Sequence, residues 1–103
     1  MPAAALDPVI HAPLRLQICA ILAGAGNSLD FATVREMLEV SESVLSKHVK
    51  QLEEAGYVSV SKITSAQRSR TWLAMTDAGR RAFAAHAEAL RALVGDAGRL
   101  VAE

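Results

Sequence analysis

Residues 29–58 read LDFATVREMLEVSESVLSKHVKQLEEAGYV and combine two helical patterns with a short turn between them. The first pattern runs from Phe31 to Leu38, and the turn takes in residues 39–41. The second pattern runs over residues 42–55 and is followed by Gly56, a residue type that readily adopts the left-handed conformation found just after helix ends. The stretch therefore predicts a helix, a tight turn and a second helix in direct succession.

Capping and apolar spacing support both helices. Asp30 and Ser41 stand directly before them, where short polar side chains accept hydrogen bonds from the first turn. Each helix has apolar residues at the spacing of one helical face. These residues are Phe31, Val34 and Leu38 in the first helix and Leu45, Val49 and Leu52 in the second. We expect the two faces to pack on a common core.

An earlier helix is predicted from Pro13 to about Ala23, after a short helical turn over residues 7–11 that Asp7 and Pro8 initiate. Ser28 and Leu29 then suggest a brief extended segment. The predicted helix has an apolar face formed by Leu14, Ile18, Ile21 and Leu22. Its lone thiol, Cys19, is expected to pack as a small apolar group.

A β-hairpin is predicted over residues 57–75, with strands at Val58–Ser61 and Thr71–Met75. Residues 64–69 between the strands contain neither Gly nor Pro, so we expect a longer loop and no tight two-residue turn. From Ala55 to Thr76 the chain has no acidic residue. A final helix begins at Thr76-Asp77 and carries a heptad-like apolar seam.

The composition agrees with one α-rich domain, because 51% of the 103 residues are apolar and only 4% are aromatic. A single cysteine excludes an intramolecular disulfide and a multi-cysteine metal site within one chain. The net charge is zero, yet residues 1–40 sum to −2 and residues 41–75 to +2. A local cationic surface is therefore compatible with the neutral total.

The surface of the second helix suggests a function. Short hydroxyls, one apolar side chain and two cations can enter a DNA major groove and meet base edges or phosphates. The hairpin that follows adds cations suited to phosphates or a minor groove. The alternative for the helix is a solvated face, and for the hairpin it is a charged edge that resists aggregation. The candidate residues are Ser41, Ser43, Val44, Ser46, Lys47, Lys50, Lys62, Arg68 and Arg70.

Three segments carry a family resemblance. Residues 29–58 closely resemble small bacterial winged helix-turn-helix transcriptional regulators related to the MarR-like and ArsR-like groups. Residues 75–83, MTDAGRRAF, are similar to the segment after the wing in MarR-like proteins. Residues 6–15, LDPVIHAPLR, are similar to the N-terminal signature of a short, single-domain branch.

The resemblance implies a mainly α fold with a β-hairpin wing: a three-helix core, an N-terminal turn and a long C-terminal helix. It implies one domain over residues 1–103, with the core at 13–75 and terminal helices at 6–23 and 76–101 that form a homodimer. Little sequence precedes the first helix, so the dimer interface is expected to be smaller than in larger MarR-like proteins. The expected dimer residues are Leu6, Ile10, Phe83, His86, Leu90, Leu93 and Leu100.

These features predict a cytoplasmic regulator, expected to be a repressor, that binds double-stranded DNA with residues 41–55 in the major groove and residues 57–75 on the backbone or minor groove. We expect no enzymatic activity, cofactor, metal or membrane partner, because no matching motif is present. His48 could bond a phosphate or pack on a neighbouring helix, and His86 could sense pH or simply pack in an interface. The rival interpretation is a winged-helix module that binds a protein. The sequence leaves two alternatives for control of DNA binding: a small-molecule effector at the apolar seam, or redox chemistry of Cys19.

Overall fold

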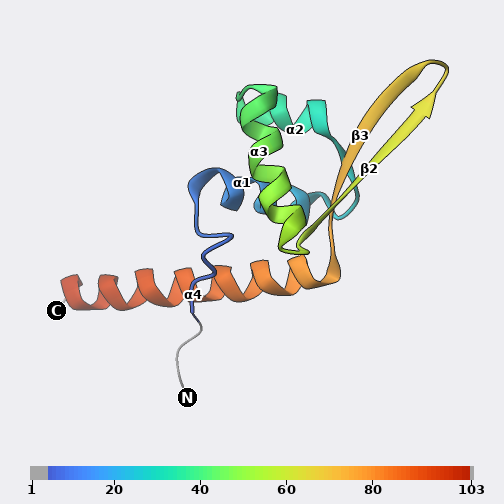
Figure 1. Ribbon diagram of the computed structural model, residues 1–103. Helices are drawn as coiled ribbons and strands as arrows, with labels where there is room; N and C mark the ends of the chain where they lie inside the picture. Colours follow the sequence, from blue (N-terminus) through green and yellow to red (C-terminus); the bar gives the residue numbers. More distant parts are fainter. Residues whose placement is uncertain (1–4, 103) are drawn as a thin grey trace.

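The structure, a computed structural model, describes residues 5–102, with side chains described from residue 5 to residue 97. Helices alternate with a small sheet in the order expected for the family that the sequence resembles (Figure 1). The elements are α1 (Pro13–Ala25), β1 (Leu29–Asp30), α2 (Phe31–Leu38), α3 (Glu42–Glu54), β2 (Val58–Ser65), β3 (Arg68–Met75) and α4 (Asp77–Ala102). The mainly α class with a hairpin is confirmed. α1 extends two residues beyond the predicted Ala23 before it ends at Gly26, whose φ is 74°.

The predicted helix starts are confirmed by hydrogen bonds. The Asp30 carboxylate accepts the Ala32 N–H at 2.9 Å, and the Ser41 hydroxyl accepts the Val44 N–H at 3.2 Å. Before α1, the Asp7 carboxylate accepts the N–H groups of Val9 and Ile10, which shapes a turn over residues 8–10. A polar side chain before each segment thus satisfies amides that have no partner within the helix.

The end of α3 is closed by a Schellman motif. The Gly56 N–H donates to the Glu53 carbonyl at 2.9 Å, and the Tyr57 N–H donates to the Leu52 carbonyl at 3.0 Å. Gly56 has a φ of 81°, the left-handed conformation that glycine adopts without a steric penalty. This motif turns the chain sharply from α3 into β2.

One apolar core joins all three core helices to the sheet. Its fully buried members are Ile10, Ile18, Cys19, Leu22, Val34, Leu45, Leu52 and Leu73. The predicted packing role of Cys19 is confirmed, and burial raises the pKa of its thiol to about 11. Such a thiol stays protonated near neutral pH and is a poor nucleophile.

The hairpin corrects the predicted loop. β2 and β3 pair without interruption from Val58↔Met75 to Ser65↔Arg68, which leaves only Ala66 and Gln67 between them. Their φ values of 49° and 66° are those of a type I′ turn. Neither residue favours this conformation, but eight consecutive cross-strand pairs outweigh a cost of about 1–2 kcal/mol per residue. β1 pairs with the other edge of β3, giving the sheet order β1-β3-β2.

α4 begins beneath the core and its C-terminal half extends past the rest of the chain (Figure 1). It continues through Gly95 without a break. Although α4 has 26 residues, no helix in the described part of the chain is long and apolar enough to cross a membrane.

The start of α4 is locked to the end of α3. The Thr76 hydroxyl donates to the Gly56 carbonyl at 2.6 Å and accepts the Gly79 N–H at 2.9 Å. The Thr76 N–H donates to the Tyr57 carbonyl at 3.0 Å. A Cβ atom on Gly79 would lie 2.1 Å from that carbonyl oxygen, so only glycine fits. This contact explains the Thr-x-x-Gly spacing in residues 76–79.

We therefore expect Gly79→Ala to lower the free energy of unfolding by about 3 kcal/mol, because two segments of backbone would have to separate. Gly24→Ala is the matched control, since a Cβ atom at that position of α1 would have no neighbouring atom within 4 Å. It should raise stability by about 0.5–1 kcal/mol. Urea denaturation of both variants measures the difference, and equal stabilities would contradict the proposed contact.

Candidate nucleic-acid interface

α3 presents a polar and cationic stripe opposite its buried side. Ser43, Lys47 and Lys50 recur at helical spacing and are all exposed, whereas Leu45 and Leu52 on the other side are fully buried. Val44, which is 41% exposed, flanks the stripe. The predicted surface of short polar groups, one apolar side chain and two ammonium groups is therefore brought together on one helix.

Ser41 has a structural task in the same region. Its hydroxyl caps α3 by accepting the Val44 N–H, and it lies 3.3 Å from the Ser43 hydroxyl. A DNA contact from Ser41 would have to share this oxygen, whereas Ser43 is exposed and its hydroxyl caps no amide among the described residues.

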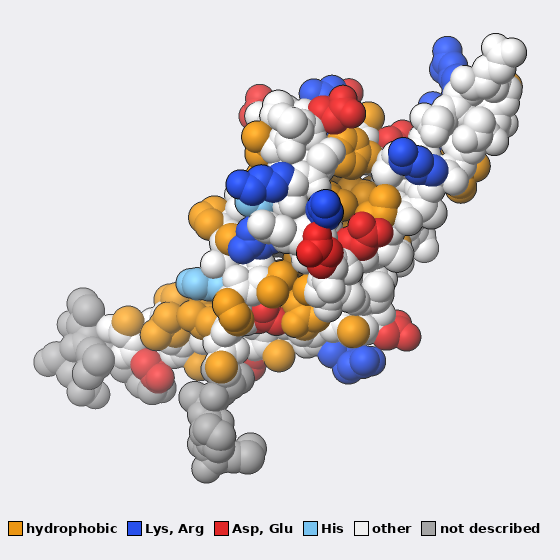
Figure 2. All heavy atoms as spheres, in the orientation of Figure 1, with side chains coloured by type: hydrophobic (Ala, Val, Ile, Leu, Met, Phe, Trp, Pro, Cys, Tyr) orange, Lys and Arg blue, Asp and Glu red, His pale blue; other side chains and the backbone are white. Residues whose placement is uncertain are grey.

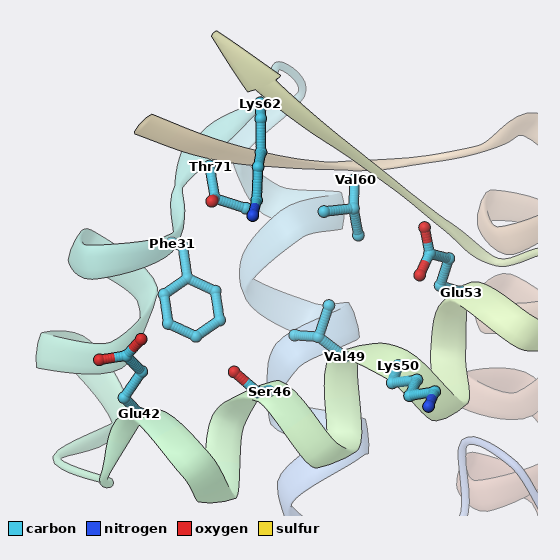
Figure 3. A pocket seen from close by; sticks show the side chains of 9 residues that line it. All are labelled: Phe31, Glu42, Ser46, Val49, Lys50, Glu53, Val60, Lys62 and Thr71. Atoms are coloured by element: carbon cyan, nitrogen blue, oxygen red, sulfur yellow. The ribbon is translucent and has the colours of Figure 1, made fainter. Parts of the chain in front are cut away.

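A groove of about 350 Å³ separates α3 from the wing (Figure 3). Phe31, Val49 and Val60 give it an apolar lining, and the Ser46 hydroxyl points into it. The ammonium group of Lys62 points into the groove beside Thr71, whereas that of Lys50 is directed away from it. The remaining lining residues, Glu42 and Glu53, lie at its two ends.

Strand alternation divides the wing cations between two faces. Lys62 pairs with Thr71 and shares the face that lines the groove beside α3. Ser65 pairs with Arg68 and Ile63 with Arg70, so the arginines lie on the opposite face, where they line a smaller hollow with Trp72. In the sequence these three cations form one cluster, whereas the alternation of side chains along the strands places Lys62 on one face and Arg68 and Arg70 on the other. Arg68 adjoins the turn and so remains at the wing tip.

Arg70 is also engaged by an acid. Its guanidinium lies 3.6 Å from the Asp30 carboxylate, which links β3 to the start of α2. The arginine side chain is 59% exposed and the aspartate side chain 22% exposed, so solvent weakens the pair. A phosphate that binds Arg70 would therefore compete with Asp30 for the guanidinium group.

His48 packs on α1 through Arg15. The Arg15 guanidinium donates to His48 Nδ1 at 3.2 Å, to the Gln51 side-chain carbonyl and to the Val9 carbonyl. Burial, together with the charges of Arg15 and Lys47, lowers the pKa of His48. The packing alternative for His48 is thus the one observed, and Arg15 is a connecting residue that sequence reasoning did not identify.

A space-filling view shows Lys and Arg side chains spread over α3 and along the wing, with acidic side chains between them (Figure 2). The cationic character is therefore distributed over this face and not confined to one patch. No group of three or more His, Cys, Asp and Glu side chains within the described residues is placed to hold a metal ion.

The predicted dimer residues fall into three groups. Ile10 and His86 are fully buried within the single chain, and Phe83 packs against its core, because α1, β3 and the N-terminal segment all contact α4. Leu6 and Leu90 are half-buried, and Leu93 is 56% exposed. Leu100 falls in residues 98–103, whose side chains lie outside the described part of the structure.

Sequence profiles and solved structures identify the family. Residues 14–94 match the model of the winged helix DNA-binding domain family. The chain belongs to this family. An uncharacterized protein of Methanocaldococcus jannaschii is 32% identical over 75 residues, which are 73% of this chain and 80% of that protein.

Solved structures agree with this assignment. A transcriptional regulator homologue from Pyrococcus horikoshii superposes with a TM-score of 0.80 and 26% identity, covering 85% of this chain and 86% of that one. The zinc-responsive MarR family member ZitR from Lactococcus lactis shares the fold, with a TM-score of 0.62, 22% identity and coverage of 91% and 63%. The predicted winged-helix fold is thus confirmed.

Capping and recognition can be separated by mutation. We expect Ser41→Ala to lower the free energy of unfolding by about 1 kcal/mol, because the Val44 amide loses its acceptor. Ser43→Ala should change it by less than about 0.5 kcal/mol. Chemical denaturation compares the two, and equal losses of stability would show that Ser41 has no special capping role.

Proposed function

We propose that this chain is a homodimeric, sequence-specific DNA-binding transcriptional regulator that acts as a repressor. The observation that carries the proposal is the exposed Ser43, Lys47 and Lys50 stripe on α3 of a winged helix DNA-binding domain. Short hydroxyls leave room for close approach to base edges, and the two lysines supply attraction to phosphates.

In this arrangement α3 enters the major groove and the wing tip follows the adjacent backbone or minor groove. In this proposal Lys62 and Arg68 reach DNA from different sides of the hairpin, because the strand register places them on opposite faces. Arg70 contributes as a secondary contact because Asp30 already holds part of its charge. Repression would then be steric: a dimer bound across a promoter blocks RNA polymerase from that DNA and needs no direct contact with the polymerase.

The homodimer proposal uses the apolar side chains of residues 90–94 in α4. Leu90 and Leu93 continue the helical stripe that begins with Phe83 and His86, and Leu93 and Val94 are 56% and 67% exposed. Exposed apolar side chains grouped on one helix favour burial against a partner. A two-fold axis through paired α4 helices would place two α3 helices on successive half-sites of a pseudo-palindrome.

The DNA proposal predicts altered salt dependence. Lys47→Ala and Arg68→Ala should each weaken binding to duplex DNA and reduce the slope of log affinity against log salt by about one unit per lost phosphate contact. Arg91→Ala is the control, since Arg91 lies on α4 in a solvent-exposed pair with Glu88. Fluorescence anisotropy with a random-sequence duplex measures this. Undetectable binding even at low salt would favour the protein-binding alternative.

The dimer proposal predicts a selective change in oligomeric state. Leu93→Glu should raise the dissociation constant of the dimer more than about tenfold, because burial of a leucine contributes about 1.5–3 kcal/mol. Met37→Glu is a matched control, since Met37 is 58% exposed on α2 and outside the proposed interface. Analytical ultracentrifugation reports the result, and a monomeric wild-type chain at high concentration would refute the interface.

A further inference from the structure

The N-terminal segment is tied to two distant parts of the chain through one residue, Asp7. Its backbone N–H donates to His86 Nδ1 on α4 at 2.9 Å. Its carboxylate accepts the Tyr57 hydroxyl at 2.6 Å and also the Val9 and Ile10 amides. Asp7 therefore connects residues that are 50 and 79 positions away in sequence.

Tyr57 is the residue through which this connection reaches the DNA-facing elements. Its N–H closes the Schellman motif of α3, and its carbonyl accepts the Thr76 N–H at the start of α4. It also directly precedes β2, the first strand of the wing. A displacement of Tyr57 would therefore change the orientation of α3 relative to the wing.

His86 is the other end of the connection and is fully buried. Because its Nδ1 accepts the Asp7 N–H, the imidazole must be neutral, with its proton on Nε2. Nε2 has no hydrogen-bond partner among the described residues. A second proton on this ring would convert Nδ1 from acceptor to donor, oppose the Asp7 N–H and place a charge in the core.

We propose that Asp7 is a positioning residue for DNA binding. Its hydrogen bonds to Tyr57 and to neutral His86, together called the Asp7 clasp, hold α3 and the wing in a fixed orientation relative to α4. Protonation of His86 breaks the bond to the Asp7 amide and thereby weakens DNA binding. The inference rests on the proposed DNA-binding function. It adds a coupling within the chain between α4, the proposed dimer helix, and the elements proposed to contact DNA.

The charges around His86 determine the pH range. Burial lowers the pKa of His86, His11 on the same N-terminal segment lowers it further, and Asp7 opposes the change. The His11 and His86 rings are 5.4 Å apart between centroids. On α1, the Cys19 thiol interacts electrostatically with Asp7 and Arg15, and Cys19, Leu73 and Met75 belong to the buried apolar core. The neutral form is therefore favoured near pH 7.

The sign of the effect follows from linkage. The pKa of His86 is lower in the folded chain than its ordinary value of 6.5, so the folded state resists protonation. The clasp is fully formed above about pH 6.5 and is lost progressively as the pH falls through the lower folded pKa. For Asp7, burial raises the pKa, but the hydrogen bonds from Tyr57, Val9 and Ile10 outweigh it and lower the pKa below 3.8. Asp7 therefore stays ionised throughout the transition.

The test measures affinity for a random-sequence duplex by anisotropy between about pH 8 and pH 5.5 at constant ionic strength, with each protein normalised to its own value at about pH 8. We expect wild type to lose affinity severalfold by about pH 5.5 relative to His86→Asn, whose amide oxygen replaces Nδ1 as acceptor and does not titrate. The loss should stay below about tenfold, because a single group with a pKa below 6.5 is less than about nine-tenths protonated at about pH 5.5. Tyr57→Phe, which removes the hydroxyl, should bind more weakly at pH 8 and show a smaller pH response. His48→Gln removes the titration of the histidine on α3 and should retain the loss.

Two further readouts separate positioning from general stability. Circular dichroism at each pH must show that wild type is still folded where its affinity falls. The 15N spectrum of the His86 ring at neutral pH should show an unprotonated Nδ1, and the Asp7 amide should become exchangeable as the pH decreases. A pH profile of wild type that coincides with that of His86→Asn, or a protonated Nδ1, overturns the inference. Absence of duplex binding at pH 8 would instead overturn the proposed function.

Discussion

The contact between Gly79 and the Tyr57 carbonyl is the constraint on which the arrangement of the chain depends. It brings the first turn of α4 against the end of α3 so closely that a Cβ atom on residue 79 would overlap the carbonyl oxygen. Thr76 reinforces the crossing with hydrogen bonds to Gly56 and Gly79. Because the wing leaves and returns at this crossing, its direction relative to α3 is set by backbone contacts and not by the exposed side chains that would meet DNA.

The face that is proposed to bind DNA is supported by a buried interior on the other side of α3. The stripe of Ser43, Lys47 and Lys50 projects from a helix whose other side is fully buried, so its direction is fixed by the core. The directions of the wing cations are less firmly fixed by the core, because Lys62 and Arg68 lie on opposite faces of a hairpin whose outer half is exposed. This arrangement suits a mode of DNA binding in which the well-packed α3 positions the protein on the duplex and the exposed wing adds electrostatic attraction to phosphates.

The polar groups beneath this face connect it to α4. Arg15 joins the N-terminal segment to His48 and Gln51 of α3, and Asp7 joins the same segment to Tyr57 and His86. Both connections pass through residues 7–9, so a short N-terminal segment contacts the recognition helix and the proposed dimer helix together. A change at α4 thus has a physical route to α3 through hydrogen bonds with defined donors and acceptors.

Local patterns in the sequence determined the helices, their caps and the family, because capping by Asp30 and Ser41 and the left-handed Gly56 depend on residues a few positions apart. The stripe on α3 followed from the same periodicity. Tertiary structure alone decided the tight turn at Ala66-Gln67, since pairing along the whole hairpin outweighs the turn residues' own preferences. It also decided the burial of His86 and its bond to Asp7, because a contact spanning 79 residues leaves no periodic or compositional signal in the chain.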